Sequence, residues 1–261
     1  MQVNDSFARR LRLRRLYRHD DSGLLIVPLD DAIGAGPLAH RGTLDSLAGE
    51  LAGNGADAVV LHKGAVRRIR PDRFRRMALV LQLNAGTGLG YDPDAKYPVA
   101  TVEEALRLGA QAVSVQVNVA SRTEGRQLAH LATAAESCDR WGVPLLAMMY
   151  ARGPDVRDGR DPALVAHALA VAVEVGADLV KTALPDAETS IARITAACPV
   201  PVLAAGGPDT SDASLGRLAG AVAAGAGGIA AGRLVFTADD PGAVVRRLAA
   251  LVHGRTPVPA R

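Results

Sequence analysis

Short aliphatic runs alternate along this chain with longer segments whose apolar positions recur at helical spacing. Most of the runs lack the every-second-residue polar pattern of a half-exposed strand, which indicates strands that are buried on both faces. Eight such strands are predicted, at residues 24–30, 58–63, 78–84, 112–118, 144–150, 179–183, 201–207 and 228–233.

Helices are predicted between these strands, and local signals mark where several of them begin. Thr101 and Glu104 form a capping box. Aspartate–proline pairs at 161–162 and 240–241 place an N-cap before a first-turn proline. The predicted helices cover 44–53, 103–108, 122–141, 162–175 and 241–252, with a short lead-in helix in 6–18.

Four predicted strands are preceded by Gly-Ala-Asp or a close variant, at 55–57, 109–111, 176–178 and 225–227. Glycine in this position ends a helix and turns the chain into the next strand. Eight strand–helix units predict an α/β fold, a (β/α)8 TIM barrel, in one domain over 1–261 with a loose tail at 254–261. A doubly wound open sheet is the alternative, but no Gly-x-Gly-x-x-Gly follows the first strand.

Composition and charge limit the classes of function that the chain could have, and they leave the predicted fold as it is. The net charge of +3 is small for this length and gives no indication of nucleic acid as a partner. No apolar run reaches the ~18 residues of a membrane span. The two cysteines have no metal or redox spacing, as expected of reduced thiols in a cytoplasmic protein.

Two segments invite interpretations beyond the barrel. The arginine-rich stretch 6–18 resembles a transit peptide or a nucleic-acid arm, and it also suits a helix that covers one end of the barrel or joins a subunit contact. We favour the helix, because no serine-rich cleavable stretch follows. The turn-rich connection 86–98 is a candidate lid or subunit contact, and we expect a homo-oligomer.

Nearly every predicted strand ends in a polar residue or a glycine after an apolar body. Catalytic groups of TIM barrels lie at the C-terminal ends of strands, so these residues are expected to surround one pocket. They are Asp30, Lys63, Asn84, Asn118, Tyr150, Lys181, Gly206 with Gly207, and Gly232 with Arg233.

Lys181 is the most informative of them, because it is one of only three lysines and lies within an apolar strand. A buried lysine is costly unless it is paired or neutral, and a neutral amine forms Schiff bases with ketones. From the residues alone, a structural lysine and a Schiff-base lysine both remain open. In the second case Tyr150 and Asp30 are placed to transfer protons, and Lys63 or Arg233 to keep the amine neutral.

The last two strands carry the clearest binding signal. Loops after strands seven and eight often bind phosphate in this fold, through backbone N–H groups beside glycines and through arginine. Gly206, Gly207, Gly232 and Arg233 are therefore candidate phosphate ligands, unless the glycines only satisfy turn geometry. The six histidines have no zinc-ligand spacing, and neither a metal nor a cofactor is expected.

From about residue 11 to 236 the chain resembles the DhnA-type class I aldolases. The family's Schiff-base lysine falls on Lys181, its tyrosine acid/base on Tyr150 and its strand-one aspartate on Asp30; its phosphate ligands fall on the glycines and arginine named above. The resemblance is carried by Ile26-Val-Pro-Leu-Asp30, Leu61-His-Lys-Gly64, Thr101-Val-Glu-Glu-Ala105, Val113-Ser-Val-Gln-Val-Asn118, Pro144-Leu-Leu-Ala-Met-Met-Tyr150, Arg152-Gly153, Ala177-Asp-Leu-Val-Lys-Thr182, Ala205-Gly-Gly-Pro208 and Gly232-Arg233.

The resemblance implies a metal-independent class I aldolase that uses a phosphorylated ketose or dihydroxyacetone phosphate and an aldehyde. An actinomycete branch of the family joins dihydroxyacetone phosphate to L-aspartate 4-semialdehyde, giving a C7 amino-oxo-heptanoate phosphate of the aminohydroxybenzoate type. We favour that reaction. The alternatives are a transaldol-type heptulosonate synthase, a fructose-bisphosphate aldolase, and a non-enzymatic barrel that binds a sugar phosphate.

Two positions depart from the family's usual pattern. Asp31 and Gln116 stand where histidines are usual, and we assign both to the substrate pocket together with Lys63 and Asn118. Asp31 either contacts an amino group of the acceptor or faces solvent. The departures leave the Schiff-base lysine in place and bear on the acceptor.

Overall fold

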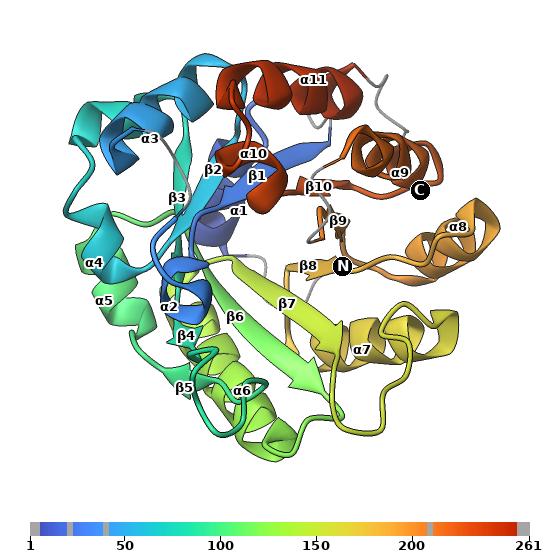
Figure 1. Ribbon diagram of the computed structural model, residues 1–261. Coiled ribbons are helices and arrows are strands. Elements are labelled where there is room, and N and C mark those ends of the chain that lie inside the picture. The colour runs from blue at the N-terminus through green and yellow to red at the C-terminus, as the bar shows by residue number, and fades with distance from the viewer. Residues whose placement is uncertain (1–5, 20–22, 39–41, 208–210, 255–261) are drawn as a thin grey trace.

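The computed structural model describes residues 6–19, 23–38, 42–207 and 211–254, and a closed barrel of parallel strands lies at its centre (Figure 1). The TIM barrel predicted from the sequence is confirmed, with the strands in the circular order β1-β10-β9-β8-β7-β6-β3-β2. Their bounds are β1 Leu24–Pro28, β2 Ala58–Leu61, β3 Ala78–Gln82, β6 Ala112–Val119, β7 Leu145–Ala151, β8 Leu179–Thr182, β9 Val202–Ala205 and β10 Gly228–Ala230.

Helices surround the barrel, and several begin at the caps that the sequence indicates. Thr101 Oγ1 accepts the backbone N–H of Glu104 at 3.2 Å, and the Asp161 carboxylate accepts two N–H groups of the first turn that follows. The helices are α1 Phe7–Leu16, α2 Ala32–Ala35, α3 Leu44–Gly53, α4 Lys63–Val66, η1 Pro71–Arg75, α5 Val102–Arg107, α6 Glu124–Trp141, α7 Pro162–Val175, α8 Glu188–Ala197, α9 Asp212–Ala223, α10 Arg233–Phe236 and α11 Pro241–His253. Among these described helices none combines the length and the apolar character needed to cross a membrane.

The glycines predicted to join helices to strands are confirmed in that role. Each has a positive φ, between 81° and 108°, where a side chain is disfavoured: Gly55, Gly109, Gly176 and Gly225. Of the predicted tail, residues 255–261 lie outside the described part of the chain.

Alternate residues of each strand face two different cores. Leu25 and Val27 pack toward the outer helices, whereas Leu24 and Ile26 belong to a smaller cluster inside the barrel. Successive side chains of a strand point to opposite faces, and in-register neighbours on parallel strands point to the same face. Once the inward-facing residues of one strand are known, those of the other strands follow. Lumen-facing members of the inner cluster include Ala58, Val80, Ala112, Met148, Leu179, Leu203 and Ala230.

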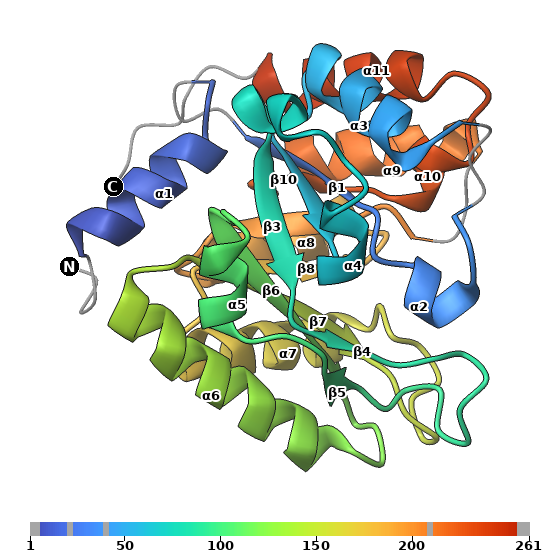
Figure 2. The same cartoon turned by 90° about the vertical axis from the view of Figure 1, so that its left-hand side faces the viewer.

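Helix α1 closes the N-terminal end of the barrel, as the lead-in interpretation of residues 6–18 predicts. Figure 2 shows α1 across one end, with α2 and the β4–β5 hairpin at the opposite end. Leu16 is fully buried in the inner cluster. The Arg9 guanidinium donates to Asp178 Oδ1 at 3.1 Å and also bonds Asp139.

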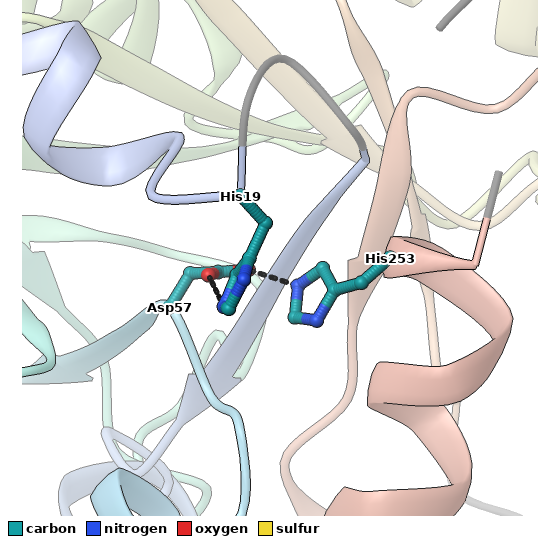
Figure 3. A group of neighbouring side chains, drawn as sticks. All are labelled: His19, Asp57 and His253. Carbon is teal, nitrogen blue, oxygen red and sulfur yellow. Dashed lines mark hydrogen bonds and ion pairs between the residues drawn. The ribbon is translucent and has the colours of Figure 1, made fainter. Parts of the chain in front are cut away.

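Three chain segments also meet at this end around the buried carboxylate of Asp57 (Figure 3). Asp57 Oδ2 accepts the backbone N–H of Leu25 and lies 2.8 Å from His253 Nε2, while Oδ1 lies 3.5 Å from His19 Nε2. These three side chains have the geometry of a possible metal site. The Arg18 guanidinium, 3.6 Å from Oδ1, already supplies positive charge there, so the cluster ties together the segment before β1, the start of β2 and the end of α11.

Two predicted strands end earlier than expected. β2 stops at Leu61, because the carbonyl of His62 accepts N–H groups from Ala65 and Val66 and starts α4. β3 stops at Gln82; Asn84 instead belongs to β4 (Asn84–Ala85), which forms an antiparallel hairpin with β5 (Tyr97–Pro98).

Candidate active site

One cavity of about 1040 Å³ opens at the C-terminal ends of the strands. It collects most of the side chains singled out in the sequence, although they come from every part of the chain. The predicted residues that line it are Asp30, Asp31, Gln116, Tyr150, Lys181, Gly206, Gly207, Gly232 and Arg233.

Lys181 lies at the inner wall of this cavity. It is paired in register with Met148 on β7 and Leu203 on β9, and both of these belong to the inner cluster. Its side chain therefore points into the lumen, where it is 9 % exposed. No hydrogen bond or ion pair of Lys181 is present among the described residues, which leaves the amine directed at the cavity.

Tyr150 stands beside Lys181 on the next strand. It follows Met148 by two residues on β7, so it shares the lumen-facing side, and it packs against the inner cluster. The Arg152 guanidinium lies 5.3 Å from the centroid of the Tyr150 ring. A phenol and a lysine amine thus face the same space from adjacent strands.

Asp30, which lines the cavity, acts electrostatically on His62, which is not part of the lining. Burial raises the pKa of the Asp30 carboxyl, against the opposing effects of the nearby Lys181 and His62 charges. Burial lowers the pKa of His62, against the effect of Asp30. His62 Nδ1 is buried without a hydrogen-bond partner in the described structure.

His62, rather than Lys63, faces the lumen, and this corrects the assignment of Lys63 to the pocket. Ala58 and Val60 point inward, so the same parity carries His62 inward and Lys63 outward. Lys63 Nζ donates to Glu104 Oε2 at 3.2 Å, outside the cavity. Residues 58–62 are all buried, so the sequence carries no alternating polarity that would have identified His62.

Asn118 is also displaced from its predicted place on the pocket wall. It is completely buried, and its Nδ2 donates to the carbonyl of Asp94 at 2.7 Å while its Oδ1 accepts from Gln116 Nε2 at 3.0 Å. Gln127 Nε2 donates to the same Asp94 carbonyl at 3.0 Å. Asn118 therefore supports the loop after β4, and Gln116 is the residue of this pair that reaches the cavity.

The predicted phosphate side lies at the ends of β9 and β10. The N–H of Gly206 donates to Ala230, and a Cβ at Gly206 would lie 2.8 Å from Ala231 Cβ, so close packing accounts for this glycine. Gly207 has a φ of 71° and nothing within 4 Å of a Cβ, and its backbone is open to the cavity. Its neighbour Pro208 lies outside the described residues.

Arg233 and Asp31 face each other across the cavity mouth. Arg233 Nε lies 3.5 Å from Asp31 Oδ2, and both side chains are about half exposed. The Asp31 carboxylate is therefore ion-paired as well as partly exposed to solvent. Any anion that binds Arg233 competes with Asp31 for the guanidinium group.

The cavity is strongly cationic, which the sequence alone did not indicate. Its lining includes the three carboxylates of Asp30, Asp31 and Asp94 and the six basic side chains of Lys96, Arg152, Arg160, Lys181, Arg217 and Arg233. Lys96 and Arg160 lie in connections, Arg217 lies in α9, and Arg152 follows the last residue of β7, so none of them is the final residue of a predicted strand. A cavity with this excess of positive charge favours anionic ligands.

Comparisons with known proteins agree with this geometry. The DeoC/LacD family aldolase model matches residues 24–238. The chain is 54 % identical over 255 residues to 2-amino-4,5-dihydroxy-6-oxo-7-(phosphonooxy)heptanoate synthase of Streptomyces griseus, which covers 97 % of this chain and 93 % of that protein. It is 41 % identical over 243 residues to 2-amino-3,7-dideoxy-D-threo-hept-6-ulosonate synthase of Halobacterium salinarum, covering 93 % and 90 %.

Among solved structures, the chain matches an archaeal fructose-1,6-bisphosphate aldolase whose catalytic lysine is covalently bound to the carbinolamine intermediate of the substrate. The TM-score is 0.84 at 29 % identity, and the match covers 95 % of this chain and all of that one. The barrel and its family relatives define a class I, Schiff-base aldolase. More particularly, the chain belongs to the DeoC/LacD aldolase family.

Proposed function

We propose that this aldolase joins dihydroxyacetone phosphate to L-aspartate 4-semialdehyde through a Schiff base on Lys181. The observation that carries the proposal is the lumen-facing amine of Lys181, which lies between Tyr150 on one side and the β9–β10 end of the cavity on the other. The 54 % identity to a synthase named for a seven-carbon amino, oxo, phosphorylated product supports this pair of substrates.

The chemistry follows from the amine and its neighbours. Lys181 Nζ attacks the ketone carbon of dihydroxyacetone phosphate, and the carbinolamine loses water to give an iminium. Loss of a proton from the adjacent hydroxymethyl carbon sends its electron pair toward the iminium and leaves an enamine. The enamine carbon attacks the aldehyde carbon, the aldehyde oxygen takes a proton, and water hydrolyses the new iminium to release the product and free Lys181.

Tyr150 and Asp30 are proposed to transfer these protons. Tyr150 shares the lumen face with Lys181 on the adjacent strand, and Asp30 is close enough for the Lys181 charge to act on its carboxyl group. The donor phosphate is proposed to bind at Gly207, Gly232 and Arg233, with Gly206 providing the space. Phosphate oxygens accept charge-assisted bonds from arginine and from backbone N–H groups.

Borohydride trapping tests the Schiff base. Incubation with dihydroxyacetone phosphate and borohydride is expected to add the reduced ketose to a peptide containing Lys181, and Lys181→Met is expected to abolish the adduct. Lys63→Gln is the matched control, because Lys63 is ion-paired to Glu104 outside the cavity. An adduct that appears on another lysine, or no adduct at all, contradicts the proposal.

Product analysis with a panel of aldehydes tests the acceptor. A seven-carbon product from aspartate semialdehyde, formed faster than a hexose bisphosphate from glyceraldehyde 3-phosphate, is the expected result. Preference for glyceraldehyde 3-phosphate would instead favour fructose-bisphosphate aldolase activity, which the likeness to the archaeal enzyme makes the second candidate.

Self-association is a further part of the proposal. Leu89 and Tyr91 lie on the 86–98 connection and are each 99 % exposed, as residues of a subunit contact are in an isolated chain. Light scattering is expected to give a mass above 27.0 kDa, and replacement of both residues by serine to lower that mass.

A further inference from the structure

Lys96 is a cavity lysine that the mechanism above does not use. It lies between β4 and β5, on the connection that follows β3, and its half-buried side chain lines the cavity. Its ammonium group approaches the backbone of Gly86, where a Cβ would lie 3.4 Å from Lys96 Nζ.

Lys96 has no ion-pair or hydrogen-bond partner among the described residues. Two arginines around the cavity have one: Arg233 pairs with Asp31, and Arg160 pairs with Asp186. Burial and the neighbouring charge of Arg152 lower the pKa of Lys96, and the carboxylates of Asp94, Asp30 and Asp31 oppose that effect. An ammonium group that is partly desolvated and unpaired has lost hydration without gaining a counter-ion, which an incoming anion would supply.

The backbone beside Lys96 is held before any ligand arrives. Two buried amides, from Asn118 and Gln127, donate to the carbonyl of Asp94. The N–H of Ala95 donates to the carbonyl of Asp92 at 3.2 Å. Groups that are fixed in advance lose less conformational entropy when a ligand binds, so this support favours a binding role for Lys96.

The strand that leads to Lys96 is not a neighbour of the strands that carry the proposed phosphate side. β3, which leads to Lys96, is separated from β9 and β10 by three strands in one direction and by two in the other. Arg152 follows β7 on the Lys96 side of the cavity and acts electrostatically on Lys96. In the strand order, β8 with Lys181 lies between β7, which leads to Arg152, and β9, which leads to the proposed phosphate side. The new carbon–carbon bond forms between the donor and the acceptor, so the lysine that holds the donor is expected to lie between the groups that bind them.

We propose that Lys96, assisted by Arg152, binds the carboxylate of the acceptor aldehyde. This inference rests on the proposed function and names how the second substrate is recognised. Of the carboxylates that act on Lys96, Asp94 and Asp30 are not paired with Arg233, and they favour an amino acid over a phosphate here. A zwitterionic end offers its carboxylate to the lysine and its ammonium group to an aspartate, whereas a dianionic phosphate would be repelled by those aspartates.

The consequence for the reaction is orientation. An acceptor anchored by its carboxylate presents its aldehyde carbon toward the enamine on Lys181 in one pose rather than many, which lowers the entropic barrier to carbon–carbon bond formation. A neutral aldehyde of similar length lacks the anchor and is expected to react without any dependence on Lys96.

Calorimetry on the trapped enzyme tests the assignment without turnover. Borohydride reduction with dihydroxyacetone phosphate fills the donor half, and L-homoserine, the unreactive alcohol analogue of the acceptor, is then titrated into the adduct. Lys96→Gln is expected to weaken binding of L-homoserine at least tenfold, Lys96→Arg to restore part of it, and Lys63→Gln to match the wild type. Normal adduct formation by Lys96→Gln shows that the fold and the donor half are intact.

Three results overturn the inference, and they are distinguishable. Binding of L-homoserine to Lys96→Gln within twofold of the wild type removes the contact while leaving the proposed function standing. Loss of the adduct itself in Lys96→Gln would place the lysine in the donor half. If the wild-type adduct does not bind L-homoserine and the untreated wild-type enzyme does not convert aspartate semialdehyde, the proposed acceptor is refuted, and the carboxylate assignment with it.

Discussion

The side-chain amide of Asn118 holds the loop that carries Lys96, and its removal is expected to loosen that loop. Asn118 is fully buried, donates to the Asp94 carbonyl at 2.7 Å and accepts from Gln116 at 3.0 Å. Asn118→Ala deletes both bonds, although Gln127 still reaches Asp94 at 3.0 Å and Gln116 can turn to water in the cavity.

The size of the effect follows from those contacts. Only the bond to Asp94 joins Asn118 to the loop, because Gln116 lies on the same strand as Asn118. A buried hydrogen bond contributes about 1 kcal/mol net, so its loss lowers the free energy of local opening by about 1 kcal/mol. Since about 1.4 kcal/mol corresponds to a factor of ten, the population of the open loop rises about fivefold. The acceptor KM should rise with it, while trapping of dihydroxyacetone phosphate on Lys181 stays normal.

Hydrogen exchange followed by mass spectrometry measures the loop directly. Peptides that cover 86–98 are expected to exchange about fivefold faster in Asn118→Ala, with little change in peptides from α3 or α11. Asn54→Ala is the matched control: Asn54 also donates a side-chain hydrogen bond, to the Glu50 carbonyl at 2.7 Å, but it caps α3 at the other end of the barrel. Unchanged exchange of 86–98, or equal acceleration throughout the protein, would show that Asn118 does not hold this loop.

Four further predictions concern groups elsewhere in the structure. Tyr150→Phe should slow turnover by about 10²–10⁴-fold while adduct formation is affected less, measured by comparing steady-state rates with trapping; normal turnover removes the proton-transfer role. Burial raises the pKa of the Asp30 carboxyl above its ordinary value of 3.8, so Asp30 keeps its proton to higher pH. The acid limb of the pH profile of kcat/KM should therefore lie above pH 3.8, and a limb at or below that value contradicts the assignment. Leu16→Ala should destabilise the protein by about 2–5 kcal/mol in urea unfolding, since Leu16 is fully buried beneath the barrel, and a loss under 1 kcal/mol would show that α1 is dispensable. Cys138 should resist alkylation until the protein unfolds, because it is 1 % exposed and burial raises the pKa of its thiol; rapid labelling of the native protein would contradict this.

The chain's two departures from the usual family pattern, Asp31 and Gln116, both line the cavity but have different partners. Gln116 reaches the cavity from a buried amide network, and Asp31 is held by Arg233 at the opposite mouth. We expect both positions to bear on the acceptor rather than on Schiff-base formation.

The order of strands and helices could be predicted from the sequence because its determinants are local. The Thr101 cap and the glycines with positive φ act within a few residues of their own positions. Lys181 could be singled out for the same reason, since a lysine in an apolar strand is unusual whatever surrounds it. The residues at strand ends then followed from the general location of active sites in this fold.

Other features depended on how the chain closes in three dimensions. His62 faces the lumen and Lys63 faces outward because Ala58 and Val60 on β2 face inward. A shift of the strand by one residue would exchange the two orientations. Lys96 reaches the cavity only because a hairpin returns it over the barrel, and Asn118 serves that loop instead of the substrate. Local sequence fixes backbone conformation through short-range sterics and hydrogen bonds, whereas these contacts join residues far apart in the chain and arise only when the barrel has closed.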